Sequence, residues 1–383
     1  MIHLGLRPIQ NYIFSKHNII PETQERRIEN VATNLVGIHS ARLPTAYVAL
    51  VSRSVNFEPK NLRENLYRTR NLIKLRCMRR TLHILPFDIA PIAHTATLSF
   101  RITDCKRLFQ LLKISNSVIS NLQCLLIEQF NDRIFSSQEA EQIVSSQKIV
   151  TLSDFEKKVF AKALVKYLWE TGILCYVNAS DRWYSEKRYY SFTKLFYPAL
   201  DLDFVSVDEA EYQLVYHHIS KYGPVSLKDI SWWSGLGISK VRKHLLRMEG
   251  SQLIFRTRIE NSSTEFFMTN EDYQSFVEYK AIEEKWVCLL AYEDPSLKGY
   301  FESRWRYVSD KYYSLLFNQI GEVRASVVAQ GNVVGIWEWD KKVRKINVKL
   351  FEFLGNTEKA LLQKEIEKME TTLQVDIPQK QLP

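Results

Sequence analysis

The spacing of hydrophobic positions near the N-terminus predicts helices that lead into a strand. Residues 1–20 are expected to form an arm, after which Ile28, Val31, Leu35 and Ile38 recur at helical spacing. Two further helices and a strand-like region are predicted over residues 47–53, 62–67 and 71–85. Helices followed by a basic strand region indicate a first winged-helix unit, which is a helix-turn-helix with an added β-hairpin.

The middle of the chain repeats this order of helices followed by strands. Residues 88–145 have a mostly helical pattern, and Ser153 is a predicted helix N-cap with Glu156 as its partner. That helix is expected to end at Gly172, because glycine readily adopts the left-handed conformation common at helix C-termini. Strand-like runs that complete a second candidate unit lie over residues 173–177 and 188–192.

Residues 206–250 give the clearest pattern in the chain. A first helix ends at the turn Gly223-Pro224, a short helix carries Trp232 and Trp233, and a basic helix follows. Two strand-like runs then cover residues 252–256 and 265–268. This order is that of a winged helix, whose usual ligand is DNA. Since the two adjacent tryptophans cannot face the same side, one is predicted in the core and the other in the core or against a neighbouring segment.

The C-terminal part of the chain has the pattern of a β-sheet. Strand-like runs cover residues 285–292, 324–329, 333–339 and 345–351, with a tight hairpin turn at Gln330-Gly331-Asn332. A charged helix and a polar tail end the chain. The whole pattern predicts an α+β fold of three tandem winged-helix units and a C-terminal β-rich region with a helical tail. The predicted boundaries are residues 1–110, 111–205, 206–275 and 276–383.

The composition is that of a folded, basic chain. Its 383 residues are 45% hydrophobic and carry a formal net charge of +9, which suits an anionic partner. Apolar runs stay short of the roughly 18–20 residues that a membrane span needs, so a cytoplasmic protein without membrane contact is expected. The five cysteines are scattered without a CxxC pair, so neither a metal site nor an iron–sulfur cluster is expected.

Two groups of basic residues are candidate DNA contacts, because duplex DNA is a dense line of negative charge. They are Lys74, Arg76, Arg79 and Arg80 in the first strand region, and Lys240, Arg242 and Lys243 on the last helix of the third unit. The alternative for both groups is a solvated basic surface, either on an edge strand or on a helix that contacts protein. The sequence contains no recognisable catalytic triad, phosphate-binding glycine loop or paired-histidine motif. The residues alone therefore predict a DNA-binding protein.

Four segments in one order resemble the bacterial winged-helix DNA glycosylases of the AlkZ/YcaQ type. They are LVGIHSAR (35–42), MRRTLH (78–83), YGPVSLKDISWWSGL (222–236) and GNVVGIW (331–337). The resemblance spans roughly residues 25–355, and the double tryptophan and the MRRTLH strand are its most specific parts. It implies a monomeric, cofactor-free protein that forms a C-shaped, positively charged cradle for damaged duplex DNA. It also implies a bacterial, nucleoid-associated location.

The resemblance further implies a monofunctional DNA glycosylase, which hydrolyses the N-glycosidic bond of bulky or crosslinked N-alkylated purines. Such an activity serves alkylation repair, opening of interstrand crosslinks or self-resistance in producers of DNA-alkylating antibiotics. The leaving base already carries positive charge, so catalysis needs a positioned water and little acid assistance.

The catalytic motif of this family is Gln-x-Gln, or Gln-x-Asp in another branch, and the chain departs from it. The two positions are occupied by His39 and Ala41, with Ser40 between them and Arg42 directly after. Histidine can accept a hydrogen bond from water, and its unperturbed pKa of about 6.5 suits a base near neutrality. We therefore predict His39 and Ser40 as catalytic residues and Arg42 as a DNA contact.

Two other functions remain open at this point. A non-catalytic DNA-binding regulator or lesion binder would explain the loss of the second polar residue at Ala41. A protein-interaction scaffold would use the same helical units without DNA.

Overall fold

The computed structural model describes residues 2–149, 152–180, 182–183, 185–340 and 342–374. Its first residues form strand β1 (Ile2–Leu4) and helix α1 (Leu6–Lys16), so the prediction of an N-terminal arm is wrong. β1 pairs in parallel with β7 (Ile254–Ile259), which belongs to the third predicted unit. The N-terminus is therefore fixed by a segment that is distant in the sequence.

The first predicted unit forms helices around a sheet of strand order β2-β4-β3. Its elements are η1 (Pro21–Thr23), α2 (Ile28–Asn34), β2 (Ile38–His39), α3 (Leu43–Val51), α4 (Pro59–Arg63), η2 (Glu64–Arg68), β3 (Leu72–Arg76), η3 (Met78–Arg80) and β4 (Leu82–Pro86). The helix predicted to reach Ile38 ends at Asn34, because Gly37 adopts a φ of +100° and the chain then enters β2.

The region predicted as one strand over residues 71–85 is a hairpin. Arg79 and Arg80 have φ values of +51° and +59°, so the chain reverses at η3 and places His83 on the second strand. This left-handed backbone is uncommon for residues with side chains, and composition alone does not predict it.

The second predicted unit is mostly helical and has its own hydrophobic core. Its elements are α5 (Ala90–Leu111), α6 (Asn116–Phe130), α7 (Ser137–Ser146), α8 (Asp154–Glu170), β5 (Leu174–Asn178), β6 (Arg188–Phe192) and α9 (Thr193–Phe196). The predicted capping box of Ser153 and Glu156 is confirmed. Gly172 has a φ of +77° directly after the end of α8, as its proposed role at the helix terminus requires.

The third predicted unit contains α10 (Val207–Tyr222), α11 (Leu227–Ser234), α12 (Ile238–Gly250), β7, β8 (Phe266–Thr269) and α13 (Asn270–Glu278). Trp233 is buried and stacks on His218 of α10, with ring centroids 4.4 Å apart. Trp232 stacks instead on Phe301 of the C-terminal region, with centroids 4.8 Å apart. The prediction that the two tryptophans separate between the core and a neighbouring segment is confirmed.

The C-terminal region is built on an antiparallel sheet of order β12-β11-β10-β9. Its elements are β9 (Val287–Leu290), α14 (Pro295–Lys298), η4 (Arg304–Arg306), α15 (Asp310–Leu316), β10 (Ser326–Ala329), β11 (Asn332–Asp340), β12 (Lys345–Leu350) and α16 (Asn356–Gln374). The predicted hairpin turn is confirmed, since Gln330 and Gly331 have positive φ. The predicted polar tail lies largely outside the described residues.

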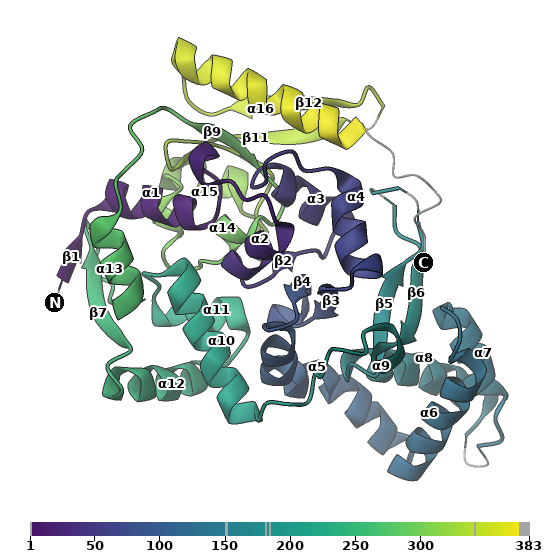
Figure 1. Cartoon of the computed structure of the whole chain (residues 1–383). Coiled ribbons are helices and arrows are strands. Elements are labelled where there is room, and N and C mark those ends of the chain that lie inside the picture. The colour runs from purple at the N-terminus through teal and green to yellow at the C-terminus, as the bar shows by residue number, and fades with distance from the viewer. Residues whose placement is uncertain (1, 150–151, 181, 184, 341, 375–383) are drawn as a thin grey trace.

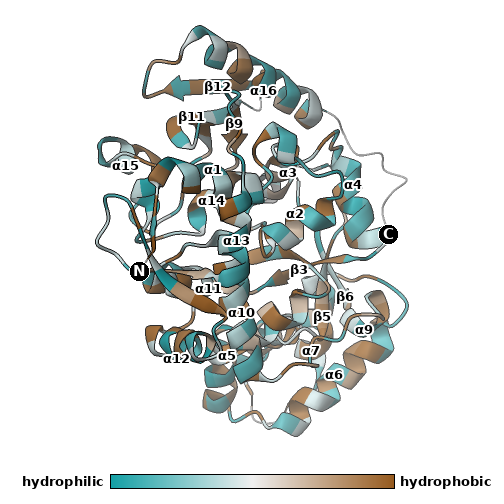
Figure 2. Cartoon of the chain, turned by 60° about the vertical axis from the view of Figure 1, so that its left-hand side comes forward, coloured by the Kyte–Doolittle hydropathy of each residue, from teal (hydrophilic) through white to brown (hydrophobic). Residues whose placement is uncertain are grey.

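One large hydrophobic core joins the first, third and C-terminal segments. In Figure 1, α16 runs along the four-stranded sheet, while α6 and α7 lie at the opposite end of the molecule. Figure 2 shows hydrophobic colouring along strands such as β3 and β9 in the interior. Across the described part of the chain, no helix is both long and apolar enough to cross a bilayer.

Candidate active site

The segment that matches the family's catalytic motif passes from the interior to the surface. His39 ends β2 opposite His83 of β4, and the backbone N–H of Ser40 donates to Leu82 at 2.7 Å. His39 and Ser40 are each only 2% exposed, whereas Ala41 and Arg42 are exposed. The two predicted catalytic residues therefore face the core, and the predicted DNA contact faces solvent.

His39 belongs to a buried polar cluster that the sequence does not reveal. Its Nε2 lies 3.0 Å from Nζ of Lys298 and 4.0 Å from Oε2 of Glu293. Lys298 and Glu293 also form an ion pair with each other. The His39 ring meets that of His83 edge to face, with centroids 5.3 Å apart. The cluster is assembled only by tertiary packing, so no local sequence signal could identify it.

Burial controls the charge of this cluster. Desolvation, together with the nearby positive charge of Lys298, lowers the pKa of His39 well below its ordinary value. Burial likewise lowers the pKa of His83 to about 3. Burial and the positive charges of Arg79 and Arg304 lower the pKa of Lys298 to about 7. At neutral pH the site thus combines two neutral imidazoles with an amine whose charged form is disfavoured by burial but favoured by its pairing with Glu293.

A small cavity of about 20 Å³ adjoins the cluster. His39, His83, Arg79 and Lys298 are among the residues that line it. A polar cavity of this size accommodates about one water molecule. Among the described residues, His39 Nδ1 has no hydrogen-bond partner, so this buried nitrogen is available to bind such a water.

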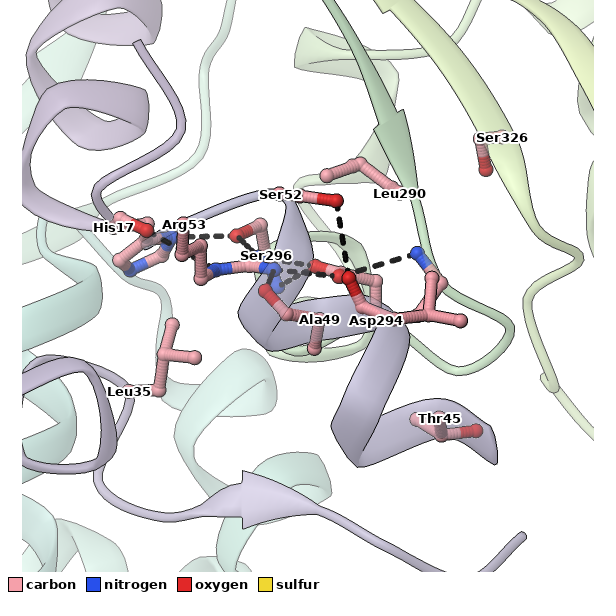
Figure 3. A network of polar contacts seen from close by, with 12 residues as sticks. His17, Leu35, Thr45, Ala49, Ser52, Arg53, Leu290, Asp294, Ser296 and Ser326 are labelled. Carbon is pink, nitrogen blue, oxygen red and sulfur yellow. Dashed lines mark hydrogen bonds and ion pairs between the residues drawn. The ribbon is translucent and has the colours of Figure 1, made fainter. Parts of the chain in front are cut away.

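A second buried network holds the turn that presents Glu293 and Lys298 (Figure 3). The guanidinium of Arg53, which follows α3, donates to both carboxylate oxygens of Asp294 at 2.9 and 2.6 Å. Asp294 in turn caps α14 by accepting from the Ser296 N–H at 3.0 Å. Glu293 is fixed separately, because its Oε1 accepts from the Val323 N–H at 2.8 Å. These contacts join the start of the C-terminal region to the helix that follows the catalytic motif.

On the exposed side of the motif lies a groove of about 930 Å³. Its lining includes Arg42, Tyr292, Arg324, Trp337, Trp339 and Arg344. The Arg42 guanidinium lies over the Tyr292 ring at 4.1 Å from its centroid, and all three arginines are exposed. Exposed arginines beside aromatic rings are a suitable surface for nucleic acid.

The first group of predicted DNA contacts makes mainly internal contacts. Lys74 is buried and pairs with Glu186 at 3.3 Å, and Arg76 pairs with buried Glu170. Arg79 packs on Trp232 at 3.4 Å from the ring centroid, and burial lowers its pKa to about 10. Arg80 is exposed beside Asp104. Of the four, Arg80 has the greatest access to a phosphate.

The second group lies on α12, where acidic residues of α10 pair with two of its three members. Lys240 pairs with Glu211 at 2.6 Å, and Lys243 pairs with Asp208. Arg242 is exposed and has no ion pair within the described part of the chain. Of the predicted basic residues, Arg42, Arg80, Lys240, Arg242 and Lys243 are exposed, and Arg242 is exposed without an ion pair among the described residues.

No group of three or more His, Cys, Asp or Glu side chains among the described residues is arranged to hold a metal ion. The chemical groups of the site are the imidazoles, the amine and the carboxylate of the buried cluster. Such a set can hold a water and exchange protons with it.

Comparisons with known proteins agree with the resemblance found in the sequence. Residues 32–372 match the family described as DNA glycosylase AlkZ-like. The chain therefore belongs to the AlkZ-like DNA glycosylase family, a family of enzymes that act on DNA. Among solved structures, it is similar to the Streptomyces sahachiroi DNA glycosylase AlkZ, with a TM-score of 0.77 and 17% identity over 98% of both chains. A search of curated proteins finds no match.

Proposed function

We propose that this protein releases N-alkylated purines, including bulky or crosslinked ones, from duplex DNA by hydrolysis of the N-glycosidic bond. The observation that carries the proposal is the position of His39, which occupies the family's motif beside a cavity sized for one water. The buried imidazole stays neutral, because its pKa is lowered, so it is proposed to position the water more than to take its proton. In the tautomer with the proton on Nε2, the unpartnered Nδ1 can accept a hydrogen bond from that water. Ser40 is proposed to assist by holding the end of β2, where its backbone N–H donates to the Leu82 carbonyl.

The charges of the cluster suit this reaction. An N-alkylated purine leaves as a neutral base, and positive charge develops on the sugar. The Glu293 carboxylate lies within 4.0 Å of His39, pairs with Lys298, and is proposed to stabilise such charge. Glu293 thereby offers the carboxylate that the motif lacks at Ala41.

We propose that the DNA is held by three winged-helix units in a C-shaped cradle on a monomer. The element order of the first unit, α2-β2-α3-α4-β3-β4, supports this assignment, as does the order of helices and strands in the second and third. Arg42, Arg80 and Arg242 are exposed and are proposed as phosphate contacts, whereas the internally paired lysines and arginines would have to exchange partners to bind DNA.

The substrate class is tested by incubating the protein with duplexes that contain N7-methylguanine, N3-methyladenine or a bulky N7-alkylguanine. Released bases are identified by mass spectrometry, with an undamaged duplex of the same sequence as the control. We expect release from the alkylated duplexes and none from the control. Absence of release from all three adducts would contradict the proposal.

DNA binding by the exposed arginines is tested through its dependence on salt concentration. Arg42→Ala, Arg80→Ala and Arg242→Ala are each expected to lower the slope of log K against log salt concentration by about 1, because one phosphate contact is lost. Lys280→Ala is the control, since Lys280 is an exposed cation after α13 that is not among the proposed DNA contacts. Equal slopes for the three arginine variants and the wild type would place the DNA elsewhere.

The alternative is a non-catalytic DNA binder, and Ala41 is the observation that favours it. A regulator of this kind would prefer one duplex sequence over others and would release no base. The same incubations distinguish the two functions.

A further inference from the structure

Helix α8 of the second predicted unit presents a row of lysines to solvent. Lys158, Lys162 and Lys166 follow one another at intervals of four residues, so they lie along one face of the helix. All three are exposed, and none of them forms an ion pair with a described residue. Their neighbour Lys157, by contrast, pairs with Asp154 at 3.2 Å. These three exposed residues are called the lysine row below.

The acidic residues of α8 do not balance the charge of the lysine row. Asp154 and Glu156 lie in the first turn, where Glu156 completes the capping box. Glu170 is buried at the other end of the helix and pairs with Arg76 and Arg101. Like charges four residues apart on a helix repel one another and lower its stability. Within the described part of the chain, the repulsion along the lysine row is therefore not offset by an ion pair.

Helix α12 has the same place in the third predicted unit, but its charges are arranged differently. α8 directly precedes the hairpin β5–β6, as α12 precedes β7–β8. Lys240 and Lys243 of α12 pair with acidic residues of α10. The exposed positions of α12 at intervals of four residues are Ile238, Arg242 and Leu246, of which two are apolar. Since the last helix of a helix-turn-helix unit is the one that lies against DNA, α8 offers DNA the stronger positive face.

We propose that the lysine row of α8 is a phosphate-binding surface that holds one strand of the substrate duplex. The proposal rests on the proposed function in that DNA is the partner, and it adds a contact in a unit for which the sequence predicts none. Eight residues of an α-helix rise about 12 Å, whereas a DNA strand rises about 3.4 Å per phosphate. The row therefore matches the length of about three to four phosphates, and its evenly spaced cations suit a regular polyanion.

The lysine row adjoins Arg80, which is already proposed as a phosphate contact. Burial raises the pKa of the Cys105 thiol on α5, and the charge of nearby Lys166 opposes that shift. Arg80 pairs at 3.4 Å with Asp104, the residue directly before Cys105. Arg80 and the end of the row thus approach the same turn of α5, which places them on adjoining surfaces for one DNA strand.

The test measures binding of an undamaged duplex, so it does not depend on base release. A triple variant, Lys158→Gln with Lys162→Gln and Lys166→Gln, removes the three charges with a residue of similar helix propensity. We expect the slope of log K against log salt concentration to fall by about 2–3, because each phosphate contact contributes about 0.9. Alkylated and undamaged duplexes are expected to lose affinity equally, since phosphate contacts do not read the base.

Two further triple variants are matched controls. Replacement of the same three lysines by arginine keeps their charge, so the wild-type slope is expected to remain. Lys349→Gln with Lys359→Gln and Lys364→Gln changes the net charge by the same amount at exposed positions outside the proposed DNA contacts. This variant is also expected to keep the wild-type slope.

An unchanged slope in the first triple variant, an equal fall in the last one, or a wild-type protein that binds no duplex would overturn the inference. If base release occurs while the first variant keeps the wild-type slope, the lysine row fails as a DNA contact and the proposed function stands. If the slope falls but no base is released from alkylated duplexes, the lysine row stands and the proposed glycosylase function fails.

Discussion

Replacement of Arg53 by methionine is expected to lower the free energy of unfolding by about 3–5 kcal/mol. The Arg53 and Asp294 side chains are both 0% exposed, and the substitution leaves the Asp294 carboxylate buried without its cation. Methionine keeps much of the volume of the side chain, so the loss reports on the charge and its hydrogen bonds more than on a cavity. Equilibrium denaturation of both proteins in urea measures the effect.

A matched control is available at the surface. Arg68 pairs with Glu64 on η2, but their side chains are 78% and 42% exposed. Exposed pairs contribute about 0–1 kcal/mol, so Arg68→Met is expected to change stability by no more than that. Equal effects of the two substitutions would contradict the role assigned to the buried pair. Because Asp294 also caps α14, Arg53→Met is further expected to displace Lys298 and to reduce activity.

Replacement of His39 by alanine is expected to slow base release by about 10²–10⁴-fold, which is the usual contribution of a positioned acid or base. Duplex binding should be unchanged, because His39 is only 2% exposed and is not among the proposed phosphate contacts. Release is measured with enzyme in excess over N7-methylguanine duplex, and binding is measured on the same duplex.

His39→Gln is the informative companion variant, since it installs the residue of the family's motif. A glutamine amide can hold a water through its oxygen, so this variant is expected to retain more activity than His39→Ala. If alanine and histidine support the same rate of release, His39 has no part in the reaction.

Local signals in the sequence predicted much of the fold. The Ser153–Glu156 capping box, the Gln330-Gly331 hairpin turn and the division of the two tryptophans depend on neighbours within a few residues. Such signals act wherever the segment lies in the molecule, because the groups that satisfy one another are close along the chain. The predicted helix boundary is wrong where an apolar run suits both a helix and a strand. The helix expected to reach Ile38 ends at Asn34, and Ile38 begins β2.

The site itself depended on tertiary packing. His39 was identified from the motif, but its burial follows from pairing with β4, and its partners Glu293 and Lys298 come from the C-terminal region. Tertiary packing also decides the role of the basic strand. Lys74 and Arg76 form an apparent DNA surface in the sequence, yet Glu186 and Glu170 from the second unit pair with them in the fold.

We expect the site to remain catalytic with histidine and alanine in the motif. The decisive measurement is the rate of N7-methylguanine release from duplex DNA by excess wild-type protein, compared with spontaneous depurination of the same duplex. Release by the wild-type protein is expected to be far above the spontaneous rate, and release by His39→Ala is expected to be close to it. Wild-type release at the spontaneous rate, with duplex binding that still weakens as salt is added, would contradict catalysis and identify a DNA-binding protein without glycosylase activity.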